Sequence, residues 1–195
     1  MNKFRASYSV LSVWDSGDWQ RAIEVYFKLR PFTTEKMAEG KDLHNEWRDY
    51  TREYKRLPKV FGNKPLINPQ PEVKLVAQLY DWLELVFIPD CVDSPIIYEY
   101  KSGVKSSEAY ANSMQIGVCA VGLTFLKTYV NKGEIYHFNQ YKKATDMSIV
   151  WITDDYLKKS LNWILTLSSE MMDYFQKNHL FERFGKAWLS TREYF

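Results

Sequence analysis

Two acidic residues and a lysine lie close together in the middle of the chain. Asp90 ends one apolar run, and Glu99 and Lys101 stand two positions apart in the next, at residues 95–101. That second run is typical of a strand, in which residues i and i+2 point to the same face. Buried charges are costly unless they are paired or bind a metal. Two carboxylates converging beside a lysine therefore predict a divalent-metal site for phosphodiester chemistry.

The spacing Glu-x-Lys is weak by itself. The chain also contains Glu53-Tyr54-Lys55, inside a predicted helix, and Glu72-Val73-Lys74. Chance explains at least two of the three copies, and the alternative for any one copy is a solvated ion pair. Context favours Glu99 and Lys101, because only this copy follows a Pro-Asp pair at the end of an apolar strand.

Two more polar residues belong to the same context. His44 lies on an upstream helix, and Gln115 faces inward from the helix that follows the strand. Each has a structural alternative: His44 and Gln115 could be hydrogen-bonded core residues, and Asp90 could cap a turn. Asp93 and Glu84 are rival carboxylates near the same strands.

The elements that must position these residues follow from periodicity and from the placing of Gly and Pro. Three strands with short connections predict an antiparallel meander, and the order α-β-β-β-α-β-β-α predicts the α/β class. The expected elements are helices at 7–30 (N-cap Ser9, break at Gly17) and 34–56, a loop at 57–71, strands at 73–80, 83–88 and 95–101, a helix at 107–130, strands at 134–141 and 148–152, and a helix to residue 177 capped by Thr153.

Composition narrows the class of protein. With 195 residues, 46% of them hydrophobic, the chain is expected to form one globular domain. A net charge of only +2 says little about a polyanionic partner. Two cysteines are too few for a disulfide framework or a four-thiolate cluster. No leader and no membrane-length apolar run is visible, which predicts a soluble, intracellular protein.

A local basic segment is the candidate nucleic-acid surface. From residue 48 to 64 there are six basic and two acidic side chains, with aromatic rings among them. Cations that follow a phosphate backbone, combined with stacking rings, suit single-stranded or frayed ends. The alternative is an ordinary charged helix face. The basic residues are Arg48, Arg52, Lys55, Arg56, Lys59 and Lys64.

Together, these residues resemble the PD-(D/E)xK nucleases, and more narrowly the RecB-like and phage-type exonuclease branch. The matching motifs are residues 40–44 (Gly-Lys-Asp-Leu-His), 99–103 (Glu-Tyr-Lys-Ser-Gly) and 114–116 (Met-Gln-Ile), within a likeness that spans residues 7–178. The chain departs from the branch at Phe87 and Ile88, where a glycine is usual, and at Cys119, where a tyrosine is usual. It also lacks the four cysteines with which some relatives hold an iron–sulfur cluster.

The resemblance implies a restriction-endonuclease-like α/β core with a central mixed sheet flanked by helices, plus a C-terminal helix. Residues 1–195 would form one domain: a helical part at 1–57, the catalytic sheet and helix at 72–152, and a C-terminal helical part at 153–195. His44, Asp90, Glu99 and the Tyr100 carbonyl would bind Mg²⁺ or Mn²⁺, without an iron–sulfur cluster. Lys101 would orient water or stabilise the phosphorane, and Gln115 would position Lys101 or a nucleotide.

The activity so implied is a metal-dependent deoxyribonuclease, an exonuclease on DNA ends in recombination, repair or phage DNA processing. The expected setting is the cytoplasm, without membrane contact. A homo-oligomer or a recombination partner protein is also expected from the resemblance. The alternatives are a structure-specific endonuclease and a non-catalytic nucleic-acid-binding or assembly protein on the same fold.

Overall fold

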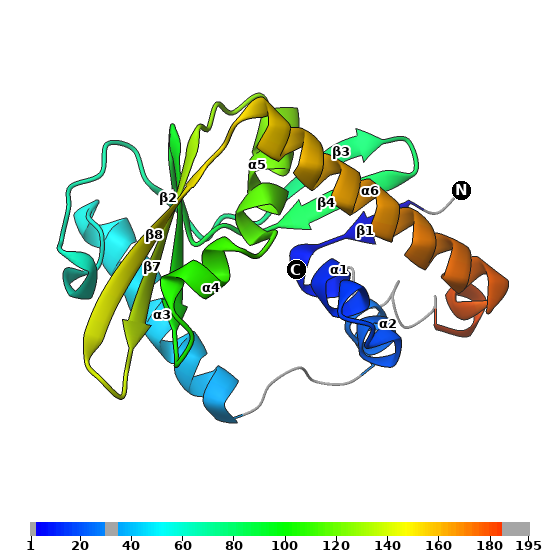
Figure 1. The fold of residues 1–195 in the computed structure, drawn as a ribbon, viewed down its shortest axis with the longest axis horizontal. Coiled ribbons are helices and arrows are strands. Elements are labelled where there is room, and N and C mark those ends of the chain that lie inside the picture. Colours follow the sequence, from blue (N-terminus) through cyan, green and yellow to red (C-terminus); the bar gives the residue numbers. More distant parts are fainter. Residues whose placement is uncertain (1–2, 30–34, 185–195) are drawn as a thin grey trace.

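The chain folds into two β-sheets with helices packed on them (Figure 1). The computed structural model describes residues 3–29 and 35–184, without the side chains of residues 35–40. Gly40 of the predicted glycine–histidine helix therefore belongs to α3, whereas the C-terminal residues 185–195 lie outside the description. In chain order the described elements are β1 (Phe4–Ala6), α1 (Tyr8–Asp15), α2 (Trp19–Phe27), α3 (Glu35–Tyr54), η1 (Lys59–Phe61), β2 (Gln70–Pro71), β3 (Leu75–Tyr80), β4 (Leu83–Phe87), β5 (Cys91–Asp93), β6 (Ile96–Ser102), α4 (Ser107–Ala111), α5 (Gln115–Phe125), β7 (Lys132–Asn139), β8 (Ala144–Trp151) and α6 (Asp154–Lys177).

Both sheets are mixed, which confirms the predicted fold class. The smaller sheet has the order β1-β4-β3, with β1 parallel to β4 and β3 antiparallel to it. The larger has the order β2-β5-β6-β7-β8, and only β6 and β7 run parallel within it. None of the described helices combines the length and hydropathy of a transmembrane segment.

The predicted three-stranded meander is wrong. The strands β3 and β4 form a hairpin, but β6 pairs with β5 and β7 in the other sheet. The chain changes sheets at Ile88-Pro89-Asp90, directly after β4 ends at Phe87. Pro89 has no N–H group with which to extend the ladder, so the apolar run cannot continue as one strand. This crossing places Asp90 between the two sheets.

Two predicted helices are each divided in two. The segment at 7–30 contains α1 and α2, separated at Gly17, which has a φ of +84°; the predicted break is confirmed, but the N-cap is Ser7 and not Ser9. The segment at 107–130 contains α4 and α5 and ends at Phe125. Ser113, between them, bonds locally, donating to the Tyr110 carbonyl (2.7 Å), which competes with a continuous helix.

The N-terminal part is not wholly helical, because β1 precedes α1. This three-residue strand is too short to show a period, and it forms by parallel pairing with β4. The predicted loop at 57–71 contains η1 and β2. Strand β7 has the predicted length but lies two residues earlier in the chain, and β8 begins four residues earlier than predicted and is longer. The Thr153 cap is confirmed: its side chain accepts the N–H of Tyr156, and Asp154 and Asp155 occupy the first turn of α6.

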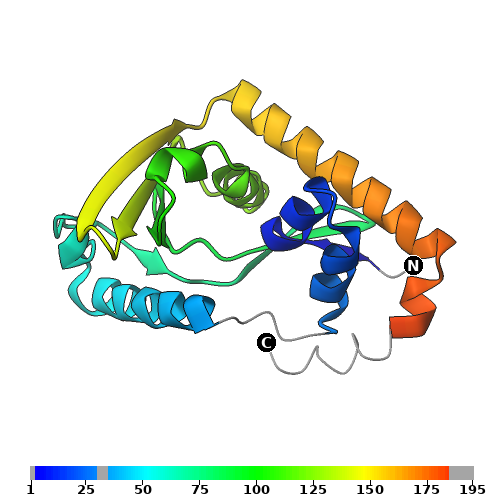
Figure 2. The ribbon, with the colours of Figure 1, turned by 60° about the horizontal axis from the view of Figure 1, so that its bottom comes forward.

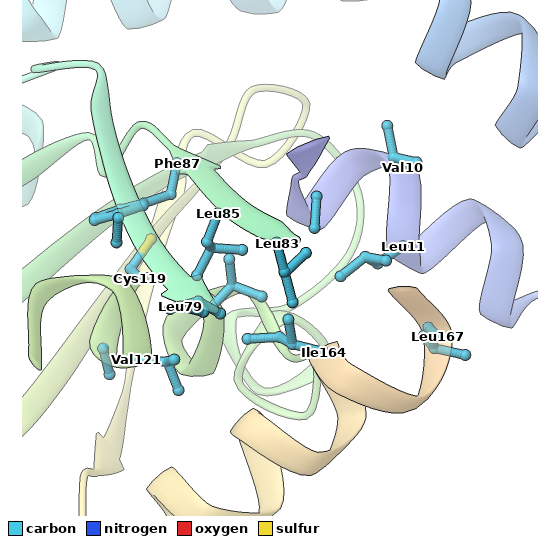
Figure 3. Close-up of a cluster of buried hydrophobic side chains, with 14 of the residues drawn as sticks. Val10, Leu11, Leu79, Leu83, Leu85, Phe87, Cys119, Val121, Ile164 and Leu167 are labelled. Carbon is cyan, nitrogen blue, oxygen red and sulfur yellow. The ribbon is translucent and has the colours of Figure 1, made fainter. Parts of the chain in front are cut away.

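Strand β6 separates two groups of packed side chains. On one face, Tyr98 and Tyr100 pack with Trp47 of α3 and Phe61. On the other, Ile97 belongs to the main core, which joins α5, α6 and the small sheet (Figure 3). Figure 2 shows α3 on one side of the larger sheet and α4 and α5 on the other. The strand that carries Glu99 and Lys101 is therefore covered on both faces.

Candidate metal and nucleic-acid site

Asp90 is held by contacts on two sides. Its Oδ2 accepts the backbone N–H of Tyr100 (2.6 Å), and its Oδ1 lies 3.6 Å from His44 Nδ1. His44 comes from α3, so Asp90 joins that helix to the start of the Glu99-Tyr100-Lys101 motif. The hydrogen bond from the Tyr100 N–H is the contact expected of an Asp that caps a turn. The other oxygen, Oδ1, faces the imidazole of His44.

Glu99 lies on the opposite face of β6 from Tyr98 and Tyr100, as the period of two requires. Its Oε2 accepts from Lys101 Nζ (3.0 Å) and from Gln115 Nε2 (2.6 Å). The thiol of Cys119, one turn further along α5, lies 3.9 Å from Oε1. The glutamate side chain is only 1% exposed. The structure therefore brings Gln115 and Lys101 together on one carboxylate oxygen.

The environments of the two carboxylates shift their pKa values in opposite directions. Burial raises the pKa of Glu99 to about 8; the Lys101 ammonium opposes this shift, and the charge of Asp90 adds to it. Burial also opposes the charge of Asp90, but Lys101 and His44 hold the pKa of that carboxyl below its ordinary value. Burial would lower the pKa of Lys101, yet Glu99 and Asp90 raise it above the ordinary range. Lys101 is therefore a permanent cation at neutral pH.

The closest cluster of potential ligand atoms contains a residue that the sequence did not single out. Among the described residues, His44, Glu72 and Asp90 each offer one ligand atom within 4.8 Å of the others. Glu72 is brought there by its backbone: its N–H donates to the Asp90 carbonyl (3.0 Å), and its φ is +43°. An imidazole nitrogen and two carboxylates form a donor set that fits a divalent cation.

The interpretation of Glu72 as a solvated ion pair is therefore incomplete. Its Oε2 does form an ion pair, with Arg48 Nη1 at 3.0 Å, but the side chain is only 23% exposed and faces the site. No spacing in the sequence distinguishes it, because Glu72-x-Lys74 looks like the other copies. Its position depends on the left-handed backbone at residue 72, which a local pattern does not reveal.

The two rival carboxylates have other partners. Asp93 accepts the backbone N–H groups of Ile67 (2.9 Å) and Asn68 (2.7 Å), and thereby holds the loop before β2. Glu84 on β4 pairs with Arg5 of β1 at 2.8 Å. Each therefore has a structural role that accounts for its place in the fold.

The predicted basic residues lie on the last turns of α3 and the segment after it. Arg48 contacts Asn45, Asp49 and Glu72, which places it next to the acidic cluster. The remaining predicted residues (Arg52, Lys55, Arg56, Lys59 and Lys64) are exposed. The rings of Tyr50 and Tyr54 lie beside them in a tilted contact, with centroids 4.7 Å apart and an interplanar angle of 38°, and Tyr54 is 53% exposed. Cations and exposed rings therefore share one surface.

A hollow of about 340 Å³ lies on the other side of the site. It is lined by Gln115 and Cys119, which contact Glu99, and by the start of α1 with Ser7 and Ser9. Two lysines, Lys28 and Lys74, also line it. Burial lowers the pKa of Lys28, and the nearby charge of Lys74 lowers it further. Two lysines thus line the same hollow as Gln115, which contacts Glu99.

Comparison of this structure with solved structures identifies the fold. An alkaline exonuclease from Laribacter hongkongensis, LHK-Exo, matches with a TM-score of 0.58 over 90% of this chain and 93% of that one, at 9% identity. The chain has the fold of this alkaline exonuclease. A structure of LHK-Exo in complex with dAMP matches this nuclease fold with a TM-score of 0.54, 10% identity and 93% coverage of both chains. No protein-family model and no curated sequence matches the chain.

Proposed function

We propose that the chain is a divalent-metal-dependent deoxyribonuclease that hydrolyses phosphodiester bonds at DNA ends. The observation that carries this proposal is the convergence of Asp90, Glu99 and Lys101, with Gln115 on Glu99 and His44 on Asp90. These residues come from four separate parts of the chain and meet within a nuclease fold. A retired site would have no reason to keep them together.

His44, Asp90 and Glu99, with the Tyr100 carbonyl, are the proposed ligands of Mg²⁺ or Mn²⁺, and Glu72 is an additional donor beside them. A divalent ion held there supplies Lewis-acid charge to the phosphodiester and to the attacking water. Within the chain, Lys101 and Gln115 both bond to Glu99 Oε2 and fix the direction of that carboxylate. They would hold it in one orientation throughout the reaction.

Lys101 acts as an electrostatic group in this proposal. Because the neighbouring carboxylates raise its pKa, it has no free base form at neutral pH with which to remove a proton from water. A fixed ammonium instead stabilises the negative charge that develops on the phosphorane. Both roles that the family resemblance implies for this lysine, orienting the attacking water and stabilising the phosphorane, are compatible with an ammonium group, whereas a role as the general base is not.

The two charged surfaces support a preference for ends. The hollow with Lys28 and Lys74 adjoins Gln115, so a terminal phosphate could bind there while the neighbouring phosphodiester faces Glu99. On the opposite side, the exposed cations after Arg48 and the neighbouring rings of Tyr50 and Tyr54 suit the remaining strand. Recombination, repair or phage DNA processing is the setting that such an activity would serve.

The test is degradation of linear duplex DNA by the purified chain with Mn²⁺ or Mg²⁺. We expect Lys101→Ala to abolish degradation and the matched control Lys105→Ala, an exposed lysine four residues away, to retain it. Circular dichroism checks that both variants are folded. Activity that survives Lys101→Ala would refute the assignment.

Two further substrates separate the alternatives. A covalently closed circle resists an exonuclease and is cut by a structure-specific endonuclease. A duplex with 5′-hydroxyl ends, compared with 5′-phosphate ends, tests the lysine hollow: we expect Lys28→Gln with Lys74→Gln to remove any preference for the phosphate. Mn²⁺ calorimetry identifies a non-catalytic protein, which would show no site that Asp90→Ala removes.

A further inference from the structure

A second hollow, of about 570 Å³, lies away from the nuclease site, between the α1–α2 turn and the C-terminal half of α6. It falls in the range of roughly 300–1,000 Å³ typical of pockets that bind small ligands. The proposed metal ligands and Lys101 come from α3, β6 and the segments before β3 and after β4, whereas this hollow uses α1, α2 and α6 (Figure 1). The two sites therefore share no residue.

Three aromatic rings form one wall of this hollow. Trp14 and Trp19 stack with centroids 5.6 Å apart and an interplanar angle of 24°. Tyr174 of α6 meets Trp14 edge-on at 5.4 Å and lies 6.2 Å from Trp19. Trp14 is buried, so its position is set by the core, but Trp19 is 52% exposed. The Trp19 indole is therefore exposed to solvent while it stacks on the Trp14 ring, which the core holds in place.

Three carboxylates line the same hollow: Asp15 at the end of α1, and Glu170 and Asp173 on α6. Asp15 is oriented by Trp163, whose indole N–H donates to it at 3.0 Å. Glu170 and Asp173 are three residues apart, so they lie on one helix face and repel each other. They also lie toward the C-terminal end of α6, where the helix dipole favours cations. Lys177 is the one cation among the lining residues.

An exposed indole and a like-charge pair are both unfavourable for the isolated domain, and both are relieved by the same ligand. A cation over the face of a Trp ring is attracted by the ring, and this attraction grows as the cation loses water. Carboxylates beside the rings supply hydrogen-bond acceptors and opposite charge. A guanidinium fits best, since it stacks on aromatic planes and bonds carboxylates through two N–H groups at once.

We propose that Trp14, Trp19 and Tyr174, with Asp15, Glu170 and Asp173, form a docking site for an arginine-bearing segment of a partner protein. The charge of the site selects the partner: the lining residues have an excess of negative charge, which attracts a basic polypeptide and repels a nucleic-acid backbone. The site would attach the chain to another protein while leaving the proposed DNA surface free.

The experiment uses the full chain and two short capped peptides, Ala-Arg-Ala-Arg-Ala and the same peptide with citrulline in place of arginine. Citrulline keeps the shape and removes the charge. Calorimetry should show binding of the arginine peptide alone, weakened about 3- to 30-fold by Trp19→Ala and similarly by Glu170→Gln with Asp173→Asn. The matched controls are Asp155→Asn, at the other end of α6, and Trp151→Ala, another exposed indole; both should bind normally.

Three results would overturn the proposal. One is the absence of binding up to millimolar peptide. Another is binding that the citrulline peptide shares, or that persists in Trp19→Ala and in Glu170→Gln with Asp173→Asn while these variants remain folded by circular dichroism. The third is equally effective displacement by tetramethylammonium chloride, which would assign the site to a small organic cation instead of a polypeptide. Degradation of DNA is measured separately, so failure of either proposal leaves the other intact.

Discussion

The buried carboxyl of Glu99 predicts how metal binding depends on pH. Its pKa of about 8 means that in the metal-free protein the group is mostly protonated below pH 8. A metal binds the ionised form, so binding must release this proton. The ionised fraction is about 1% at pH 6 and about 50% at pH 8, and the affinity for Mn²⁺ should therefore rise about 50-fold across that interval. A glutamate with an ordinary pKa would be ionised throughout it, and the affinity would be constant.

The assay is calorimetric titration with Mn²⁺ at pH 6, 7 and 8 in buffers of different ionisation enthalpy, which also counts the protons released. Because His44 is also a proposed ligand, the same series is run on His44→Gln. We expect that variant to bind more weakly but to keep the rise with pH. A flat affinity in His44→Gln, without proton release, would refute the role of Glu99 and favour the donor set of His44, Glu72 and Asp90.

Three further variants test separate contacts. Gln115→Leu removes one of the two donors to Glu99 Oε2, so DNA degradation should slow by about 10- to 100-fold and its pH profile should move to higher pH; an unchanged profile would contradict the contact. Asp93→Ala removes the acceptor of two backbone N–H groups and should lower the free energy of unfolding by about 2–4 kcal/mol in urea, while Mn²⁺ affinity stays the same; lost affinity would make Asp93 a ligand after all. Gly122→Ala places a Cβ 2.2 Å from the Phe87 ring and should cost about 1–3 kcal/mol of stability, recovered in part by Phe87→Leu; full stability of the single variant would contradict the close packing of α5 on β4.

The sequence predicted the contact between Glu99 and Lys101 because its geometry is local. Glu99 and Lys101 share a face through the period of a strand, and β6 is long and apolar enough for that period to be read. Asp90 could be placed near them only as the end of the preceding apolar run. Its bond to the Tyr100 N–H shows that this short connection does return to the motif.

The pairing of distant strands could not be predicted in the same way. The predicted meander was wrong because three consecutive strands can form one sheet or belong to two, and the chain changes sheets at Pro89. The pairing of β1 with β4 is likewise non-local and involves three residues. The prediction of one continuous helix from 107 to 130 was wrong because the helix is interrupted at Ser113, where a side-chain hydrogen bond to the local backbone competes with it.

Glu72 is the clearest example of a residue whose position could not be predicted from the sequence. Its carboxylate reaches the cluster through a backbone bond to residue 90 and a positive φ, and neither feature is visible in the pattern Glu-x-Lys. The same pattern occurs in the proposed nuclease site at residue 99 and on a solvent-facing helix at residue 53. What distinguishes the three copies is the tertiary surroundings, and only the structure supplies them.

The most direct measurement is a crystal of the protein soaked in Mn²⁺, with anomalous scattering used to locate the ion. We expect one strong peak between Asp90 and Glu99, within coordinating distance of both carboxylates and of His44, with the Lys101 ammonium beside it. An ion bound only at other carboxylates, or no peak at this position in crystals that bind Mn²⁺ elsewhere, would contradict it.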